Sequence, residues 1–323
     1  MCKRKFLSTV MVLAGMCMAF AACAGKQAQT VKVGSLKGPT SIGMAKMMDD
    51  NDRATDKKYE FVNAAAADEL VAKMVSGELD IALVPANVAG ILYNKTNQGI
   101  SVVDINTLGV LYAVSANNSI NSIEDMKNAT VYITGKGTTP DFVWQYLLAS
   151  NNMSLEDMNV EYKSEPNEVA ALLASSDDAV GILPEPYVTS LLKQNDKLSV
   201  VVDLTGEWDA VSDQNKSRLV TGVTVVRNDF LEANPEAVEQ FVNDRKESAL
   251  FVNENIDEAA ALVESYGIIG KAAIAKEAIP KCNIVCITGD EMADTLSGYL
   301  NVLYEADPTS VGGKMPEDGF YHR

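Results

Sequence analysis

The sequence predicts an α/β protein made of two similar lobes, and three observations lead to this fold class. The chain has 323 residues, 47% hydrophobic and 22% charged, which is typical of soluble globular proteins and long enough for two cores. Residues 69–85 align with residues 168–184 without a gap. A strand, a glycine-containing turn and a helix are expected ahead of each aligned segment. We therefore expect the same architecture twice.

The aligned segments share one order of elements: helix, tight turn, buried strand, proline and a second helix. ELVAKMVSGELDIALVP lies over EVAALLASSDDAVGILP. Apolar residues recur at helical spacing in the first half of each segment, and a short apolar run follows in the second half. Pro85 and Pro184 would then end equivalent strands. The alternative is a chance similarity between two amphipathic α/β units.

Two further strand-to-helix junctions are expected to open the lobes. Residues 31–35 read as a strand, followed by the turn Lys37-Gly38-Pro39 and a methionine-rich helix. Residues 130–134 read as the corresponding strand, and the next helix takes Thr139 as its N-cap and Pro140 as its first residue. Ligands of open α/β sheets bind outside the carboxyl ends of the strands, where helix N-termini present unpaired N–H groups. These junctions are therefore candidate binding elements.

Polar side chains at the helix starts are the candidate ligand contacts from both lobes. They can cap their own helix or turn toward a ligand, and their occurrence at corresponding places favours shared use. The two lysines of the first turns pair with an anion in one interpretation and are simply solvated in the other. The candidates at these junctions are Lys37, Gly38, Thr40, Ser41, Asn87, Lys136, Thr138 and Thr139.

The stretch ILPEPYVTSLL, residues 182–192, places a carboxylate and an aromatic ring where a strand gives way to a helix. Glu185 either faces the cleft mouth or complements the dipole of the following helix. Tyr187 either packs on a ligand or fills the lobe core. Trp208, expected in a polar loop, either closes over the ligand or anchors that loop. All three are added to the candidate site.

Two apolar segments indicate where the chain passes between the lobes. Residues 107–114 are expected to leave the first lobe, and residues 221–227 to return to it as a strand. Asn234-Pro235 then precedes a long amphipathic helix. The first lobe is therefore predicted to be discontinuous, residues 30–112 with 222–323, and the second to be 113–221.

Charge and histidine content exclude several classes of function. The formal net charge is −17, and no basic run follows Lys3-Arg4-Lys5, which argues against nucleic-acid binding. The sole histidine, His322, is the penultimate residue. Catalytic triads and histidine metal sites need a positioned imidazole, so we expect neither an enzyme nor a cofactor or metal site.

The N-terminus has the anatomy of a secretory signal: three basic residues, a mostly apolar segment 6–22 and small residues before Cys23. The run AFAAC resembles a bacterial lipobox, which implies cleavage after residue 22 and lipid on the Cys23 thiol. Residues 23–29 would be a lipidated tether, and the mature chain would carry 24 basic against 44 acidic residues, a charge of −20. Ordinary secretion or an uncleaved anchor is the alternative.

Cys282 and Cys286 are the two cysteines left after processing. On a strand, residues four apart are separated by about 13 Å, too far for a disulfide, and on a helix the geometry is marginal. We expect two free thiols.

Taken in order, the lipobox-like run, KVGSLKGPTSIG, SGELDIALVPAN, TGKGTTPDF, LPEPYVT and NPEAVEQFV resemble the substrate-binding proteins of ABC importers. The subgroup looks like the binders of nitrate, sulfonate, taurine, bicarbonate and thiamine precursors. The resemblance covers about residues 30–323. It implies a two-lobed periplasmic-binding-protein type II (Venus-flytrap) fold with two crossover strands. It also implies a monomer that traps a small ligand and delivers it to a membrane permease with its ATPase.

Two alternatives remain at this point. One is a lipid-anchored ligand sensor or adhesin without a transporter. The other is an enzyme on the same fold, such as a thiamine-pyrimidine synthase-like protein, although such enzymes rely on histidines and a cysteine cluster that this chain lacks. The ligand is not named by the sequence. The absence of arginine from the cleft-lining turns weakens the nitrate and sulfonate readings, whereas an aromatic or heterocyclic metabolite fits Tyr187 and Trp208.

Overall fold

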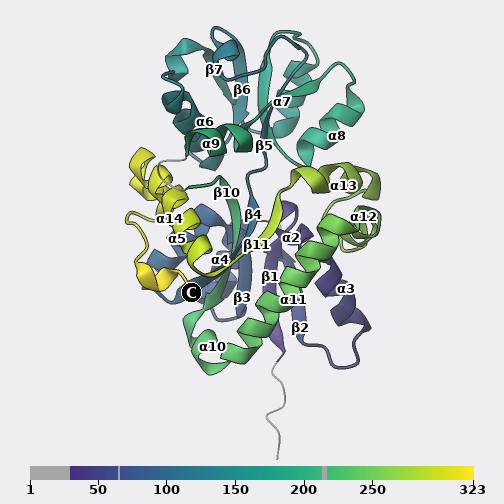
Figure 1. Ribbon diagram of the computed structural model, residues 1–323, viewed down its shortest axis with the longest axis vertical. Helices are drawn as coiled ribbons and strands as arrows, with labels where there is room; N and C mark the ends of the chain where they lie inside the picture. Colours follow the sequence, from purple (N-terminus) through teal and green to yellow (C-terminus); the bar gives the residue numbers. More distant parts are fainter. Residues whose placement is uncertain (1–29, 65, 213–216) are drawn as a thin grey trace, which may run out of the picture.

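The structure is a computed structural model that describes residues 30–64, 66–212 and 217–323. Its two lobes stand one above the other, each with a central sheet covered by helices (Figure 1). The signal segment, Cys23 and the tether lie outside the described residues. The two-lobed, mixed α/β fold predicted from the sequence is confirmed.

The first lobe holds a six-stranded sheet in the order β11-β4-β10-β3-β1-β2. Strand β1 runs parallel to β2 and β3, whereas β10 runs antiparallel to both β3 and β4. The strands are β1 (Val31–Leu36), β2 (Tyr59–Ala64), β3 (Ile81–Pro85), β4 (Ile100–Leu108), β10 (Val220–Arg227) and β11 (Ile284–Ile287). The expected return strand is therefore present as β10.

The second lobe holds a five-stranded sheet in the order β7-β6-β8-β5-β9. Strand β6 runs parallel to β7 and β8, and β5 runs antiparallel to β8 and β9. The strands are β5 (Leu111–Ser115), β6 (Thr130–Thr134), β7 (Asn159–Lys163), β8 (Val180–Pro184) and β9 (Ser199–Asp203). In each sheet, the strand next to the three-stranded parallel unit is antiparallel to it, and the chain enters that strand from the other lobe: β10 in the first lobe and β5 in the second. Strands β3 and β8, aligned by the sequence repeat, hold equivalent positions.

The helices lie on both faces of the two sheets (Figure 1). They are α2 (Pro39–Ile42), α3 (Ala45–Arg53), α4 (Ala67–Val75), α5 (Ala86–Lys95), α6 (Thr139–Ser150), α7 (Pro166–Leu173), α8 (Tyr187–Gln194), α9 (Leu204–Val211), α10 (Asn228–Ala233), α11 (Pro235–Glu254), α12 (Ile256–Ser265), α13 (Ala272–Ala278) and α14 (Gly289–Ala306). Short 3₁₀ turns are η2 (Glu124–Met126), η3 (Leu155–Asp157), η4 (Ile279–Lys281), η5 (Pro308–Val311) and η6 (Asp318–Phe320).

The chain changes sheet at two places. It leaves the first sheet between β4 and β5, through Gly109 and Val110, and returns between α9 and β10. A Cβ on Gly109 would lie 2.2 Å from Thr205 Oγ1 and 2.7 Å from Leu219 Cδ2. Because real side chains never approach so closely, a glycine is what lets the two crossovers pack against each other. The predicted lobes, residues 30–112 with 222–323 and residues 113–221, stay a proposal, and each predicted boundary falls two residues inside a strand, because β5 begins at Leu111 and β10 at Val220.

On one side of the junction, an apolar contact joins the lobes through α14, α6 and α9. Trp208 is fully buried there, its ring centroid 4.3 Å from that of Tyr146 and 5.6 Å from that of Tyr299. Its indole N–H donates to Ser217 Oγ at 3.1 Å. The prediction that Trp208 lies in a polar loop is wrong, because residues 204–211 form helix α9 and bury the ring against α14.

On the other side of the junction, α8 meets α13 through polar contacts (Figure 1). Lys193 of α8 forms an ion pair with Glu277 of α13. Lys281 Nζ lies 3.8 Å from Glu185 Oε1, and its carbonyl accepts a hydrogen bond from the Tyr112 hydroxyl at 2.8 Å. The lobes are thus joined by apolar packing on one side and by charges on the other.

Candidate functional site

A cavity of about 310 Å³ lies where strands of both lobes end; we call it the inner chamber. The end of β3, the start of α6, the end of β8 and both crossovers line it. Its lining residues are Pro85, Asn87, Val110, Leu111, Thr138, Thr139, Pro140, Pro184, Leu219 and Thr221. None of these side chains is charged.

A larger and more open cavity of about 860 Å³ lies beside it; we call it the vestibule. Pro184 lines both cavities, so they are neighbouring compartments of the space between the lobes. The vestibule is bounded by the β1–α2 turn, by α8 and by the segment that joins α12 to α13. Its lining residues are Lys37, Gly38, Pro39, Pro184, Glu185, Pro186, Tyr187, Ser190, Lys193, Gln194, Ile268, Ile269, Gly270, Lys271 and Ile274.

The sequence candidates fall into three groups, and their role as ligand contacts stays a prediction. The inner chamber is lined by Asn87, Thr138 and Thr139. The vestibule is lined by Lys37, Gly38, Glu185 and Tyr187. Neither cavity is lined by Thr40, Ser41, Lys136 or Trp208.

The packing of helix α2 explains why Thr40 and Ser41 do not line either cavity. Helix α2 is a single turn packed on β10, and both side chains are buried. The Ser41 hydroxyl donates back to the Leu36 carbonyl. A Cβ on Gly222 of β10 would lie 2.5 Å from the Thr40 methyl carbon, so the threonine faces the sheet rather than the cleft.

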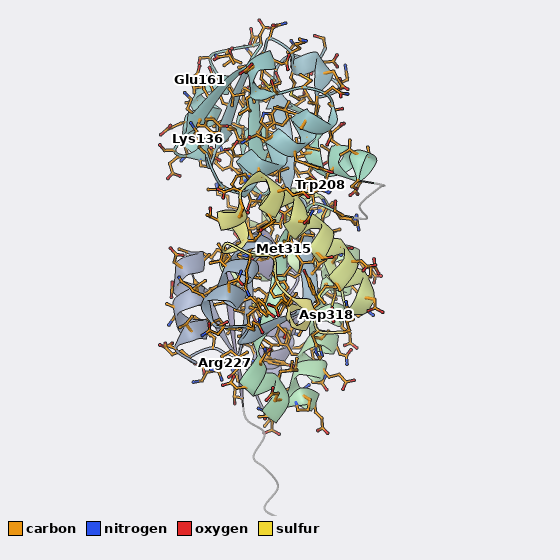
Figure 2. The ribbon with its side chains drawn as sticks, turned by 90° about the vertical axis from the view of Figure 1, so that its left-hand side faces the viewer. Lys136, Glu161, Trp208, Arg227, Met315 and Asp318 are labelled. Atoms are coloured by element: carbon orange, nitrogen blue, oxygen red, sulfur yellow. The ribbon has the colours of Figure 1, made fainter. Side chains whose placement is uncertain are left out.

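Lys136 is turned toward its own lobe. Its ammonium lies 5.1 Å from the centre of the Tyr162 ring, a cation–π contact. Figure 2 shows Lys136 well up in the second lobe, whereas Trp208 lies at the level where the lobes meet. The anion-pairing interpretation of this lysine therefore has no support from its position.

Helix α6 begins one residue earlier than predicted, with Thr138 as its N-cap and Thr139 as its first residue. The Thr138 hydroxyl donates to the Gly135 carbonyl at 2.5 Å. The sequence reasoning missed Asp141, a buried carboxylate in the first turn that accepts hydrogen bonds from the Gly137 N–H at 2.8 Å and the Tyr162 hydroxyl at 2.7 Å. An acidic residue just after a helix start was the signal that could have found it.

Glu185 is buried just before α8, and its carboxylate bonds to the first turn of that helix. It accepts hydrogen bonds from the Thr189 backbone N–H at 3.1 Å and the Thr189 hydroxyl at 2.9 Å. Burial raises the pKa of Glu185 above its ordinary value, against the effects of Thr189 and the Lys281 ammonium. These contacts match the interpretation in which Glu185 complements the dipole of α8. Tyr187 donates its hydroxyl to Asn167 at 2.8 Å.

Two buried hydroxyls beside the inner chamber were missed by the sequence reasoning. Tyr299 of α14 lies next to Thr139, but its hydroxyl forms no hydrogen bond of good geometry within the described part of the chain. Thr205 Oγ1, against Gly109, likewise has no partner among the described residues. Thr205 lies on α9, the helix just before the second crossover, whereas Tyr299 belongs to a helix that only the fold brings to Thr139, so no local pattern could have shown Tyr299.

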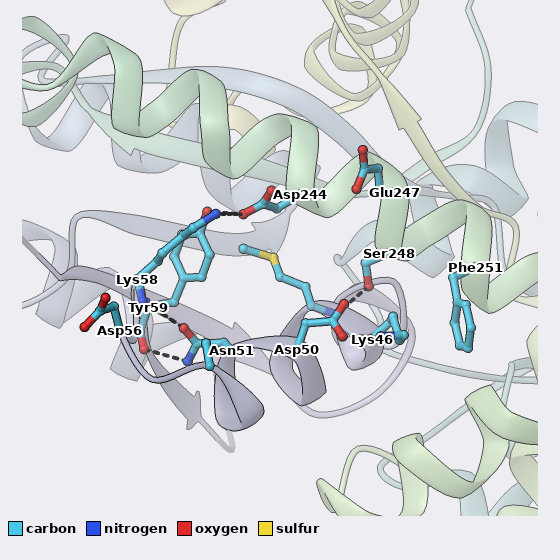
Figure 3. A pocket seen from close by; sticks show the side chains of 12 residues that line it. Lys46, Asp50, Asn51, Asp56, Lys58, Tyr59, Asp244, Glu247, Ser248 and Phe251 are labelled. Atoms are coloured by element: carbon cyan, nitrogen blue, oxygen red, sulfur yellow. Dashed lines mark hydrogen bonds and ion pairs between the residues drawn. The ribbon is translucent and has the colours of Figure 1, made fainter. Parts of the chain in front are cut away.

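A third cavity, of about 370 Å³, lies on the flank of the first lobe between α3 and α11 (Figure 3). Its ionic groups largely bond to one another: Asp50 pairs with Lys46, while Asp244 accepts from Lys58 Nζ at 3.3 Å and the Tyr59 hydroxyl at 2.7 Å. Among the described residues, no carboxyl end of a parallel strand and no residue of the second lobe lines it. We do not assign it to the ligand site.

The thiols and acidic groups offer no reactive centre. Cys282 and Cys286 are free, as predicted, and burial raises the pKa of both thiols, that of Cys286 to about 11. Both therefore stay protonated at neutral pH. Within residues 30–64, 66–212 and 217–323, no three His, Cys, Asp or Glu side chains are grouped to hold a metal ion. The same residues include no helix with the length and apolarity needed to cross a bilayer.

The sequence of this chain is similar to those of known binding proteins. Residues 42–278 match a family model described as the phosphonate ABC transporter periplasmic substrate-binding protein. A protein of Brucella abortus (strain 2308) named as a binding protein is 24% identical over 235 residues, which cover 71% of this chain and 70% of the relative.

Two solved structures show the same fold. An ABC transporter protein from Parabacteroides distasonis superposes with a TM-score of 0.77 at 24% identity, covering 91% of this chain and 99% of the other. The periplasmic aliphatic sulphonate binding protein from Escherichia coli gives a TM-score of 0.71 at 14% identity, covering 91% and 92%. The family model spans most of both lobes, and the chain belongs to the periplasmic substrate-binding proteins of ABC transporters.

Proposed function

We propose that this chain is a lipid-anchored receptor that encloses one small organic ligand between its lobes and delivers it, unchanged, to an ABC import permease. The observation that carries the proposal is the inner chamber, which is lined by β3 and α5 of one lobe, by α6 and β8 of the other, and by both crossovers. A ligand that contacts both lobes favours the closed arrangement over the open one, and hinge motion at the crossovers supplies the switch.

The chamber supports a ligand bound by hydroxyl and amide groups. The Asn87 amide and the Thr138 and Thr139 hydroxyls line it, with no arginine or lysine among its residues. The family model carries the description phosphonate, and one structural relative binds aliphatic sulphonates, so organic phosphonates and sulfonates are the first compounds to test.

A thermal-shift screen of the purified chain against phosphonates, sulfonates and a metabolite panel tests the proposal. A ligand that binds only the folded chain stabilises it by about 2.7 kcal/mol at a hundredfold excess over its dissociation constant. Calorimetry should then give one ligand per chain, and mass spectrometry should recover the ligand intact. A chemically altered ligand would contradict a pure binding function.

The lipid anchor is tested separately. Small residues at AFAAC precede Cys23, so Cys23→Ala should move the protein from the membrane fraction to the soluble fraction. Mass spectrometry of the native protein should find acyl chains on Cys23. Cys286→Ala is the matched cysteine control and should leave the fractionation unchanged, because Cys286 lies in the first-lobe sheet. An unmodified Cys23 in the native protein would refute the anchor.

A further inference from the structure

The charge in the space between the lobes is confined to one compartment. The vestibule contains three lysines, whereas no charged side chain of the described residues lines the adjoining inner chamber. This contrast stands out in a chain of net charge −17. It bears on which end of a ligand lies deeper.

Three lysines from both lobes surround the vestibule. Lys37 and Lys271, from the first lobe, are exposed and have no ion-pair partner in the described part of the chain. Lys193, from the second lobe, pairs with Glu277. The acidic side chain that lines the same cavity, Glu185, accepts hydrogen bonds from Thr189 and lies near the Lys281 ammonium. The vestibule therefore presents uncompensated positive charge.

The inner chamber is a poor place for a full negative charge. In the second lobe, Asp141 already compensates the N-terminus of α6 and Glu185 that of α8. Pro140, the second residue of α6, removes one backbone donor. An anion placed there would lose its hydration and gain only the N-terminus of α5 and neutral polar groups, with no charged side chain among the described lining residues, which is costly.

The same chamber suits an uncharged body that carries one or two polar atoms. Helix α5 begins at Ala86 with no acidic residue in its first turn, so its N–H groups remain open to a partial negative charge. The hydroxyls of Tyr299 and Thr205, which have no partner of good geometry among the described residues, lie beside the chamber. Most of the remaining lining is apolar: Pro85, Val110, Leu111, Pro184 and Leu219.

We propose that the ligand is an organic anion bound with its uncharged body in the inner chamber and its anionic group outward, in the lysine-lined vestibule. The inference rests on the proposed ligand-binding function. It assigns Lys37 and Lys271 to recognition of the anionic group and the chamber to selection by the size of the body. Ile268, Ile269 and Ile274 give the vestibule an apolar wall. This wall would contact the part of the ligand that links its anionic group to the body in the inner chamber.

The orientation is tested with n-alkylphosphonates from methyl to octyl and the matched n-alkanols, titrated into the purified full-length chain. Affinity for the phosphonates should rise about fourfold per added methylene, because each buried methylene adds a hydrophobic increment, and should stop rising once the chamber is full. Lys37→Gln with Lys271→Gln should weaken phosphonate binding about threefold to tenfold and reduce its salt dependence. Alkanol binding should not change.

Lys136→Gln is the matched control, because this lysine occupies the corresponding turn of the second lobe but lines neither cavity. It should leave both series unchanged, and the melting temperatures of all variants should agree. Equal affinity for methyl- and octylphosphonate, or a lysine double variant that binds as well as the wild type, would overturn the orientation. Binding of only uncharged panel compounds would overturn it too. No binding by any compound would instead refute the proposed function.

Discussion

At the scale of single residues, the polar groups that line the inner chamber differ in what already holds them. Asn87 Nδ2 makes one long hydrogen bond, 3.4 Å to the Ser310 carbonyl, and the Thr139 side chain lies near the Tyr299 hydroxyl without a hydrogen bond of good geometry to it. Glu185 of the neighbouring vestibule, by contrast, has both carboxylate oxygens hydrogen-bonded to Thr189. Side chains with weak hydrogen bonds can turn toward a ligand at little cost in free energy. Substitutions of Asn87 and Thr139 are therefore the most direct test of the site.

Asn87→Ala and Thr139→Val should each raise the dissociation constant of the ligand found by the screen about tenfold to a hundredfold. The reason is that each leaves one buried polar group of the ligand without a partner. Calorimetric titration measures the change, and thermal melting of the ligand-free chain should stay close to wild type. Asn301→Ala, an exposed amide on α14 bonded to Glu305, serves as the control. Unchanged affinity in both variants would remove these residues from the site.

A second single-residue feature is a buried ion pair that holds the first lobe. Arg245 Nε donates to Asp104 Oδ2 at 2.8 Å, both side chains are fully buried, and Arg245 also donates to the Val285 carbonyl at 2.9 Å. This links α11 to β4 and β11. Removing one partner leaves a buried charge uncompensated, which is far worse than replacing both.

Arg245→Ala should therefore lower the free energy of unfolding by about 3–5 kcal/mol, measured by chemical denaturation. The double variant Asp104→Leu, Arg245→Met should recover much of that loss, because no charge is then buried. Lys314→Ala, which breaks an exposed pair with Glu317 at 3.3 Å, is the control and should change stability by about 1 kcal/mol or less. An Arg245→Ala effect no larger than this control would contradict the assignment.

At the scale of elements, the stretch ILPEPYVTSLL resolves into a strand end and a helix that carries its own carboxylate. Glu185 is the residue before Pro186, and it bonds to Thr189 one turn into α8. The carboxylate thus stabilises the start of the helix and faces Lys281 of the other lobe at 3.8 Å. Burial at this position links the protonation of Glu185 to the stability of the whole chain.

The pH dependence follows from the raised pKa of Glu185. The folded chain holds this proton more tightly than the unfolded chain, so the contribution of Glu185 to stability is fully present below the unfolded pKa and is lost as the pH rises through the raised folded value. Glu185→Gln should therefore gain stability relative to wild type as the pH rises through this window. Denaturation at a series of pH values measures the difference. A difference that stays constant with pH would contradict it.

At the scale of the whole molecule, the lobes are joined unequally. The α14 side buries Trp208 between Tyr146 and Tyr299 in a continuous apolar cluster, whereas the α8–α13 side depends on Lys193–Glu277 and Lys281–Glu185. The exposed Lys193–Glu277 pair contributes about 1 kcal/mol or less, and buried Glu185 lies 3.8 Å from the Lys281 ammonium, whereas buried aromatic side chains contribute several times more. We expect the lobes to separate first on the α8–α13 side, which is also the side of the vestibule.

Lys193→Ala combined with Glu277→Ala should expand the ligand-free chain, because the pair that bridges the lobes is gone. Small-angle X-ray scattering should show a larger radius of gyration, and raised salt should have the same effect on the wild type. Lys46→Ala, which breaks a pair with Asp50 inside α3, is the control and should leave the profile unchanged. Superimposable profiles for wild type and the double variant would contradict opening on this side.

Local pattern was sufficient for much of the fold. Helical spacing and short apolar runs predicted β3 with α4 and β8 with α7, and the gapless alignment of residues 69–85 with 168–184 predicted their equivalent places in two sheets. Turn chemistry predicted the junctions that carry Asn87 and Thr138 into one chamber. These features are local, because strand, turn and helix preferences are encoded within a few residues.

Only the tertiary structure decided which candidates reach the cleft. Thr40 and Ser41 lie at a helix start after a parallel strand, as Asn87 does, yet packing of α2 on β10 buries them, and α14 covers Trp208. Tyr299 comes to Thr139 from a helix far along the chain. Side-chain direction depends on which surfaces pack together, a property of the folded chain that no short stretch of sequence contains. The sequence by itself therefore determined the two lobes and the strand ends that meet, and long-range packing determined which side chains are left free to hold a ligand.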